Sequence, residues 1–414
     1  MSTFGLYAKS QSGYRAFHSV ETALVRVTND ILLSLDKGEE VILVLLDFSS
    51  AFDTIKHDIL LERLRLRFGI GGKAIKWIES YLFRRTQTVV IGNERSSSQT
   101  ISQGVPQGSV LGPILFTLYT SPLEDIINTH NVHKMFYADD TQLYITFTRN
   151  DHVDVAAEIS NCVRSVKEWS QVNGLKLNNT KTEFLHVSLR HRSTNPILTL
   201  NLDGTLVHAA KTCRNLGVTF DNKFTFENFV SQKCRSASFG LYKIRKIRNF
   251  LDRTTTERLI HAFVMCHFDF CNSLLFGLPS RQIKKLQLIQ NSAARLVTRT
   301  KKHESISPVL RNLHWLPIQS RIQFKILLLT YQCFHNFAPL YLTELLTPYK
   351  PERTLRSCKK SLLCIPQVIT KSYGERSFSH SASILWNNLP YQLRNTQKYT
   401  EFRTNLKTYL FNNL

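Results

Sequence analysis

The sequence lacks a hydrophobic run long enough to cross a membrane, and residues 1–10 lack the apolar core of a signal peptide. It also lacks any C-x-x-C pair. The eight cysteines are scattered, and the spacing of Cys266 and Cys271 matches no common zinc module. Reduced, mostly buried thiols are therefore the expected state. Together these absences predict a protein of the nucleus, the cytoplasm or both, neither secreted nor held in a membrane.

Acidic residues are few beside basic ones. The 31 Asp and Glu against 53 Lys and Arg leave a formal net charge of +22. Such an excess indicates a polyanionic partner, and nucleic acid is favoured over a membrane surface. The hydrophobic fraction of 43% and the aromatic fraction of 11% are typical of a folded chain. A length of 414 residues leaves room for two or three domains.

Helix and strand patterns are mixed in the first half of the chain. Val41–Leu46 is a continuous apolar run, typical of a strand buried on both faces, and Asp47 stands at its end. Met135–Ala138 and Thr141–Phe147 predict two strands joined by a tight turn that carries Asp139 and Asp140. Apolar residues at helical spacing predict helices over residues 21–35, 58–68, 73–83, 111–119 and 153–169.

The second half is basic and predominantly helical in pattern. Between Lys233 and Lys302, fifteen Lys and Arg stand against three acids. An α+β class follows, with a mixed first half before a mainly helical second half. The predicted domains are residues 1–220, a basic helical region 221–302, and a helical C-terminal domain 303–414 to which no residue pattern assigns a chemistry.

Three carboxylates stand out by position. If the strands ending at Asp47 and flanking Asp139 are neighbours, these two acids converge with Asp140, and divalent cations would relieve their repulsion. Oxygen ligands suit Mg²⁺, and two such ions can activate an attacking oxygen and stabilise a leaving phosphate. A pair of turn aspartates and a helix N-cap at Asp47 would explain the same residues. The acids alone leave both interpretations open.

Five segments decide between them because they resemble, in order and spacing, the motifs of reverse transcriptases. These are Leu46-Asp47-Phe48-Ser49-Ser50-Ala51-Phe52-Asp53, Gly104-Val105-Pro106-Gln107-Gly108-Ser109, Phe136-Tyr137-Ala138-Asp139-Asp140, Leu177-Asn178-Asn179-Thr180-Lys181-Thr182-Glu183 and Asn215-Leu216-Gly217-Val218. The finer match is to non-LTR, LINE-like retrotransposons of the Jockey and chicken-repeat kind. It rests on the runs 11–15, 19–24, 51–57, 313–317 and 385–390 and covers about Gln11 to the C-terminus.

The resemblance implies a right-hand polymerase palm with partial fingers, followed by a helical thumb. It implies an RNA-directed DNA polymerase in which Asp47, Asp139 and Asp140 hold two Mg²⁺, with Mn²⁺ as a substitute. Lys181 would act catalytically near the leaving pyrophosphate. A core phenylalanine and a surface lysine are the plainer interpretations of Phe52 and Lys181.

The remaining implied roles concern substrate and primer. Phe52 would be the aromatic gate that excludes a ribose 2′-OH. Gln107 and Gly108 would contact the incoming nucleotide or template–primer, and Arg15 would help to bind the nucleotide. Leu216 and Gly217 would form the primer grip. The implied partners are an RNA template, a DNA primer or RNA–DNA hybrid, and deoxynucleoside triphosphates, whereas protein partners and oligomeric state are not predictable.

The sequence departs from a whole element of this kind in two expected features. Much of the fingers sequence that would precede Gln11 is missing, and so is the endonuclease domain, which indicates truncation at the N-terminus. Two alternatives therefore stay open. One is a catalytically impaired relic that binds RNA or RNA–DNA hybrid without polymerising. The other is an RNA-templated RNA polymerase, against which Phe52 argues.

Overall fold

The computed structural model describes residues 6–49, 51–148, 151–178, 180–189, 199–202, 204–350 and 361–413. Ser50 and Asn179, which belong to two of the motifs, lie outside these ranges. The described residues divide into two compact units. Those of 1–19, 41–186 and 193–210 form the N-terminal unit, and those of 20–40, 187–192 and 211–414 form the C-terminal unit.

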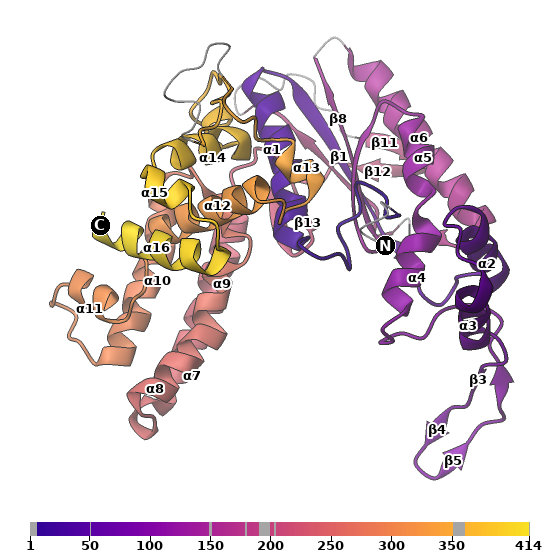
Figure 1. Ribbon diagram of the computed structural model, residues 1–414, viewed down its shortest axis with the longest axis horizontal. Coiled ribbons are helices and arrows are strands. Elements are labelled where there is room, and N and C mark those ends of the chain that lie inside the picture. The colour runs from indigo at the N-terminus through magenta and orange to yellow at the C-terminus, as the bar shows by residue number, and fades with distance from the viewer. Residues whose placement is uncertain are drawn as a thin grey trace. The chain divides into compact units, whose positions relative to one another are not determined.

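A four-stranded sheet lies at the centre of the N-terminal unit, with strand order β10-β1-β8-β7 (Figure 1). Its strands are β1 (Glu40–Leu46), β7 (His133–Tyr137), β8 (Asp140–Phe147) and β10 (Glu183–Val187). Along β1, Ile42 and Val44 pack into the main core of the unit. Val41 and Leu43, on the opposite face, are also fully buried. The prediction of a strand buried on both faces is therefore confirmed.

Helices complete this core through their apolar stripes. Phe116 of α4 (Gly112–Thr120) and Ile159 of α6 (His152–Val172) are fully buried and share the core of the sheet. Three further helices belong to the unit: α2 (His57–Leu66), α3 (Gly72–Leu82) and α5 (Leu123–Asn128). The predicted helices at 58–68, 73–83, 111–119 and 153–169 are thus all present, with ends shifted by a few residues.

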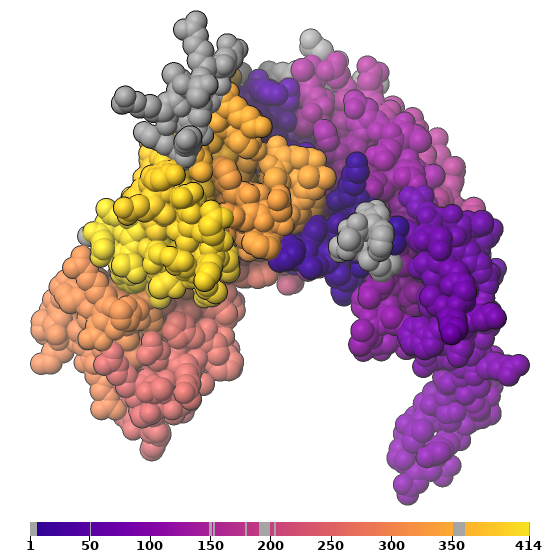
Figure 2. All heavy atoms as spheres, viewed as in Figure 1, coloured from indigo at the N-terminus to yellow at the C-terminus, as the bar shows by residue number. Residues whose placement is uncertain are grey.

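Short antiparallel strand pairs surround the sheet. β2 (Phe48–Ser49) pairs with β9 (Lys176–Leu177), and β11 (Thr199–Leu202) pairs with β12 (Thr205–His208). Two further pairs, β3 (Thr86–Gln87) with β6 (Gln99–Thr100) and β4 (Val90–Ile91) with β5 (Glu94–Arg95), form a solvent-exposed arm. Figure 2 shows this arm as a narrow purple projection from the N-terminal unit.

The C-terminal unit is built around α12 (Ile318–Phe334), which contacts α14 (Phe378–Asn387) and α16 (Tyr399–Asn412). Aromatic rings join these helices. Trp386 stacks on Phe334 with ring centroids 4.9 Å apart, and Phe402 stacks on Tyr331 at 4.2 Å. Such pairs contribute about 0.5–1.5 kcal/mol beyond the area that they bury.

The other elements of this unit are one hairpin and a series of helices and short helical turns. They are β13 (Thr212–Asn215), β14 (Val218–Asp221), α7 (Glu227–Ile247), η3 (Arg248–Phe250), α8 (Arg253–Ile260), the π-helix η4 (His261–Met265), α9 (Cys266–Asp269), η5 (Asn272–Leu275), α10 (Ser280–Thr298), α11 (Ser307–Asn312), α13 (Leu340–Thr343), η7 (Gly374–Arg376) and α15 (Tyr391–Arg394).

The first helix of the chain, α1 (Val20–Asp36), belongs to the C-terminal unit. The carboxylate of Asp36 accepts hydrogen bonds from the amides of Ile369 and Thr370 at 2.8 and 2.6 Å. It also accepts from the Thr370 hydroxyl at 2.7 Å. These buried bonds join the C-terminal end of α1 to a loop more than three hundred residues later in the chain.

The α+β class predicted from the sequence is confirmed. Strands dominate the centre of the N-terminal unit, whereas the C-terminal unit is mainly helical. Across the described ranges, no helix combines the length and the apolar character that crossing a membrane requires.

Candidate active site

Asp139 and Asp140 lie at the turn between β7 and β8. Tyr137 pairs with Asp140 in the strand register, so Ala138 and Asp139 form a two-residue turn. Ala138 has a φ of 58°, in the left-handed region, which costs an L-residue about 1–2 kcal/mol. Two-residue hairpin turns favour positive φ at this position because it matches the twist of the strands. The turn places Asp139 at the hairpin tip and Asp140 at the start of β8.

A buried glutamine holds this turn. Gln11 is 3% exposed, and its Nε2 donates to the Ala138 carbonyl at 3.2 Å, while its Oε1 accepts from the Ala138 amide at 2.9 Å. The same Oε1 accepts from the Gly13 amide at 2.7 Å. A Cβ at position 13 would lie 2.5 Å from the Ala138 nitrogen, so only glycine permits this approach. The two hydrogen bonds to the Ala138 backbone offset the strain in its φ angle.

Asp47 follows β1 and forms an ion pair with Lys181, with 3.0 Å between Oδ2 and Nζ. The two segments are joined by the β2–β9 pairing and by the Asn178 amide, which donates to the Asp47 carbonyl at 2.9 Å. The Lys181 side chain is 65% exposed. An ion pair this exposed stabilises a fold by about 1 kcal/mol at most, so Lys181 can transfer to another anion at little cost.

The charges of the three carboxylates act on one another. β1 and β8 are neighbours in the sheet, as the convergence of the acids requires. Burial raises the pKa of Asp139, and the charge of Asp47 raises it further, while Lys181 opposes both. Burial and the charges of Asp139 and Asp47 raise the pKa of Asp140 to about 6. Water still reaches part of the Asp140 side chain and screens part of this repulsion.

Within the described residues, no three His, Cys, Asp or Glu side chains lie close enough together to form a metal site. The donor set of Asp47, Asp139 and Asp140 nevertheless fits a hard divalent cation. It offers carboxylate oxygens, the ligands that Mg²⁺ prefers, and their mutual repulsion is the kind that a cation relieves. Lys181 already supplies one positive charge to this cluster.

Phe52 and Gln107 lie on two segments that pack together. The Phe52 ring stacks on Phe116, with centroids 4.8 Å apart, so its position is fixed by the core beneath it. Gln107 Nε2 donates to both carboxylate oxygens of Asp53, at 3.1 and 3.2 Å. Gly108 has a φ of 77° and open space where a Cβ would stand. The structure therefore brings the predicted gate and the predicted nucleotide-contacting residues into adjoining segments.

Arg15 is directed at the neighbouring backbone. Its Nη1 donates to the carbonyls of Ala8 and Gln11, both at 2.9 Å, and its guanidinium lies 4.9 Å from the centre of the Tyr7 ring. These contacts stabilise the segment that carries Gln11. Its contact with a nucleotide stays a prediction.

Leu216 and Gly217 form the two-residue turn between β13 and β14, where Asn215 pairs with Val218. Their φ angles of 46° and 83° are both positive, which is typical of a type I′ turn. A Cβ on Gly217 would lie 3.3 Å from the Phe270 ring, so the turn is packed against the residue that follows α9. The hairpin belongs to the C-terminal unit, and its role as a primer grip stays a prediction.

Comparison with known families settles what kind of protein carries this arrangement. The family described as "Reverse transcriptase (RNA-dependent DNA polymerase)" matches residues 1–220, more than half of the chain. The chain belongs to the reverse transcriptase family. Reverse transcriptases use divalent metal ions, in agreement with the carboxylate cluster. The matched range includes every predicted site residue, from Arg15 to Gly217.

Relatives of this reverse transcriptase come from retrotransposons. It is 27% identical to the "Probable RNA-directed DNA polymerase from transposon X-element" of Drosophila melanogaster over 304 residues, which cover 72% of this chain and 33% of the relative. It is 25% identical to the "Probable RNA-directed DNA polymerase from transposon BS" of Drosophila melanogaster over 70% of this chain and 32% of that one. The RNA-directed DNA polymerase of mobile element jockey is 28% identical over 54% of this chain and 24% of that one.

The resemblance to the reverse transcriptases of non-LTR elements is thus confirmed. The chain spans about a third of the length of the first two of these curated relatives.

Among solved structures, this reverse transcriptase is similar to two telomerases. One is telomerase from Candida tropicalis in complex with a fragment of telomeric RNA, with a TM-score of 0.40 and 11% identity over 96% of this chain and 53% of that one. The other is telomerase from Candida albicans, with a TM-score of 0.37 and 12% identity over 78% of this chain and 52% of that one. Likeness at this level supports no statement about function.

Two contacts in this reverse transcriptase were not predicted from the sequence. Gln11 belongs to a motif in the sequence, but its hydrogen bonds to Ala138 cross 127 positions of the chain. Asp53 likewise belongs to a motif, and the sequence does not indicate that its carboxylate holds Gln107. The signal available for Gln11 was a Gln-Ser-Gly run without strand or helix periodicity, and nothing in that run indicates which backbone it binds.

Proposed function

We propose that this chain is an RNA-directed DNA polymerase of a non-LTR retrotransposon. The observation that carries the proposal is the placement of the three acids: Asp47 directly follows β1, and Asp139 and Asp140 lie at the start of β8, its neighbour in the sheet of a reverse transcriptase. The reaction is attack by a primer 3′-OH on the α-phosphate of a deoxynucleoside triphosphate, directed by an RNA template. A new phosphodiester bond forms, and the bond to pyrophosphate breaks.

Asp47, Asp139 and Asp140 would hold two Mg²⁺, for which Mn²⁺ can substitute. Bound there, the ions would polarise the attacking and leaving oxygens and neutralise charge on the phosphates. The protein's own contribution is positional. Gln11 fixes the turn that presents Asp139, and the β2–β9 pairing fixes the segment that carries Lys181.

Lys181 would leave its exposed ion pair with Asp47 and approach the departing pyrophosphate, where a positive charge or a proton assists the break. Phe52, fixed on Phe116, would stand beneath the sugar of the incoming nucleotide and clash with a 2′-OH. Gln107, held by Asp53, and Gly108 would contact the nucleotide or template–primer. Arg15 would help to bind the nucleotide.

Nucleic acid contacts would extend into the C-terminal unit. Leu216 and Gly217 would hold the primer end, and the basic helices within residues 221–302 would form a thumb against the duplex phosphates. In this proposal residues 1–220 form partial fingers and palm, and residues 303–414 form a separate helical domain. The partners are an RNA template, a DNA primer and deoxynucleotides, and the place of action is the nucleus, the cytoplasm or both.

The test is primer extension on an RNA template with Mg²⁺, with deoxynucleotides and ribonucleotides in parallel reactions. The wild-type chain should add the deoxynucleotide that the template specifies, and EDTA should stop the reaction. Phe52→Val should raise ribonucleotide use relative to deoxynucleotide use by about 10- to 200-fold, the range for one changed apolar contact. Equal use of both nucleotides by the wild type would contradict the role of Phe52 and favour an RNA polymerase.

A further inference from the structure

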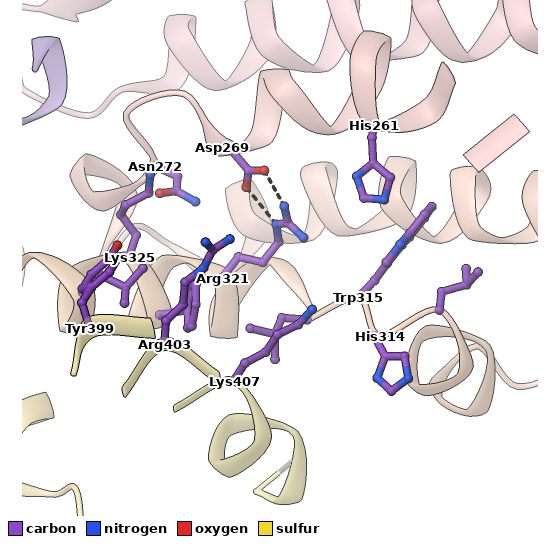
Figure 3. Close-up of a pocket in the computed structure, with 14 residues that line it drawn as sticks. His261, Asp269, Asn272, His314, Trp315, Arg321, Lys325, Tyr399, Arg403 and Lys407 are labelled. Atoms are coloured by element: carbon purple, nitrogen blue, oxygen red, sulfur yellow. Dashed lines mark hydrogen bonds and ion pairs between the residues drawn. The ribbon is translucent and has the colours of Figure 1, made fainter. Parts of the chain in front are cut away.

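The C-terminal unit contains a cavity of about 520 Å³ that the polymerase proposal does not use. It lies between α12, α16, the loop Leu313–Leu316 and the π-helix η4 (Figure 3). Cavities of about 300–1,000 Å³ are typical of sites for small organic ligands. A π-helix is also uncommon and is found disproportionately at functional sites.

Two helices present cations to this cavity at helical spacing. Arg321 and Lys325 come from α12, and Arg403 and Lys407 come from α16, each pair four residues apart and therefore on one face. Asp269 is the one acid that lines the cavity within the described residues. Figure 3 shows Arg321, Arg403 and Lys407 around the same space.

Among the residues that the structure describes, the cations of α12 pair with acids, whereas those of α16 do not. Arg321 forms a bidentate ion pair with Asp269, at 2.9 and 2.5 Å, and Lys325 pairs with Glu21 at 3.2 Å. Within the described residues, Arg403 and Lys407 have no carboxylate partner. Burial lowers the pKa of Lys407, and the charges of Arg321 and Arg403 lower it further. The cavity thus holds two positive charges that an anion would balance.

Another part of the lining is apolar and aromatic. Trp315 is 2% exposed and is held by its indole N–H, which donates to Glu257 at 3.3 Å, and by the His261 ring 5.4 Å away. Leu316 and Phe324 also line the cavity, Phe324 from α12. A ligand that fills both parts carries an anionic group at one end and a flat, largely apolar ring at the other. A nucleotide has this combination.

We propose that the cavity binds a nucleotide, with its phosphate on Arg403 and Lys407 and its base against the wall formed by Trp315, Leu316 and Phe324. A free nucleotide and one nucleotide of a single strand share this chemistry. All the lining residues belong to the C-terminal unit, so this site is separate from the carboxylate cluster.

The test measures binding of AMP, inorganic phosphate and a five-nucleotide single-stranded RNA with a photoreactive base. EDTA is present throughout, so the result does not depend on whether the chain polymerises.

The double variant Arg403→Gln, Lys407→Met keeps side-chain volume, and Lys398→Met, at the exposed start of α16, is the matched control. The double variant should bind the nucleotide probe about tenfold more weakly or worse, since two charge-assisted contacts are lost. Lys407→Arg should retain binding.

Cross-links of the bound RNA should map to residues 313–316 or 399–407. Equal affinities for AMP and the RNA would identify a free nucleotide as the ligand, and tighter binding of the RNA would identify a strand. Unchanged binding by a folded double variant would overturn the proposal. Binding of inorganic phosphate as tight as that of AMP would also overturn the proposal, because the aromatic part of the lining would then contribute nothing to binding.

Discussion

At the scale of single residues, the position of the Asp139 carboxyl depends on the peptide before it. Ala138 adopts a left-handed φ that alanine rarely takes, and Gln11 occupies both its amide and its carbonyl. Gly13 lets the chain come close enough for these bonds to form. Gln11 and Gly13 are therefore positioning residues, because they act through the turn and touch no reacting atom.

Gln11→Met should slow nucleotide addition by about 10- to 100-fold, since losing buried hydrogen-bond partners costs about 1–3 kcal/mol. Gly13→Ala should act in the same direction because its methyl group would press on the Ala138 nitrogen. The fall should lie mainly in kcat, with KM for the deoxynucleotide less affected.

Single-turnover kinetics on folded protein make this measurement, and Gly71→Ala is the control. A Cβ at position 71 meets nothing within 4 Å, and the residue's φ is −134°. If Gln11→Met lowered thermal stability but left kcat unchanged, Gln11 would be a purely structural residue.

At the scale of elements, the hydrophobic pattern predicts most helices and strands that carry the site. Val41–Leu46 is a strand because its apolar run is buried on both faces, and Asp139 lies on a hairpin turn because two apolar strands flank it. The pattern does not predict the two-residue strands β2 and β9, which are too short to show a period. They are nevertheless what brings Lys181 to Asp47.

The placement of α1 was equally beyond prediction from the sequence. Its amphipathic stripe predicts a helix over residues 21–35, but periodicity does not reveal which surface will cover that stripe. Contacts with residues far along the chain fix the position of α1, such as the hydrogen bonds of Asp36 with Ile369 and of Asn29 with Ser379. Only the folded chain shows them.

Asp36→Asn should destabilise the C-terminal unit by about 1–3 kcal/mol at neutral pH. The new side-chain NH2 group would face the N–H and O–H donors of Ile369 and Thr370, and it cannot accept their hydrogen bonds. Burial alone would raise the pKa of Asp36, but hydrogen bonds from Ile369 and Thr370 outweigh burial, and the pKa is lowered from its usual 3.8. A lowered pKa means that the stabilising effect is complete above pH 3.8 and is lost as the pH falls through the folded value.

Urea unfolding of wild type and variant at neutral and acidic pH tests this. Glu39→Gln, three residues away, is the control, because within the described residues the Glu39 carboxylate has no hydrogen bond or ion pair. The difference between wild type and Asp36→Asn should shrink as the solution becomes more acidic. A difference that is constant with pH would show that the ionised carboxylate is not what stabilises the loop.

At the scale of the whole molecule, the net charge of +22 includes lysines that lie over exposed aromatic rings. The helix α7 presents exposed rings beneath lysines: Lys243 lies 4.4 Å from the centre of the Phe239 ring, and Lys246 lies 4.8 Å from that of Tyr242. Alternating rings and cations suit a nucleic acid strand, because the cations meet phosphates while the rings meet bases or sugars.

The double variant Lys243→Ala, Lys246→Ala should weaken binding of an RNA–DNA hybrid and flatten its dependence on salt. Each lost phosphate contact should reduce the slope of log K against log salt by about 0.9, the value for duplex DNA. Fluorescence anisotropy at a series of salt concentrations gives the slope, with Lys398→Ala as the control. An unchanged slope would mean that α7 does not contact the hybrid.

The central claim is that Asp139 belongs to a polymerase active site, and extension of a DNA primer on an RNA template by Asp139→Asn tests it most directly. Asp125→Asn is the matched control, because Asp125 is 57% exposed in the same unit and forms a surface ion pair with Arg67. Hybrid binding is measured on every protein. We predict extension by wild type and control, none by Asp139→Asn, and hybrid binding by all three. Extension by Asp139→Asn would contradict the assigned site, and hybrid binding without extension by the wild type would identify a relic.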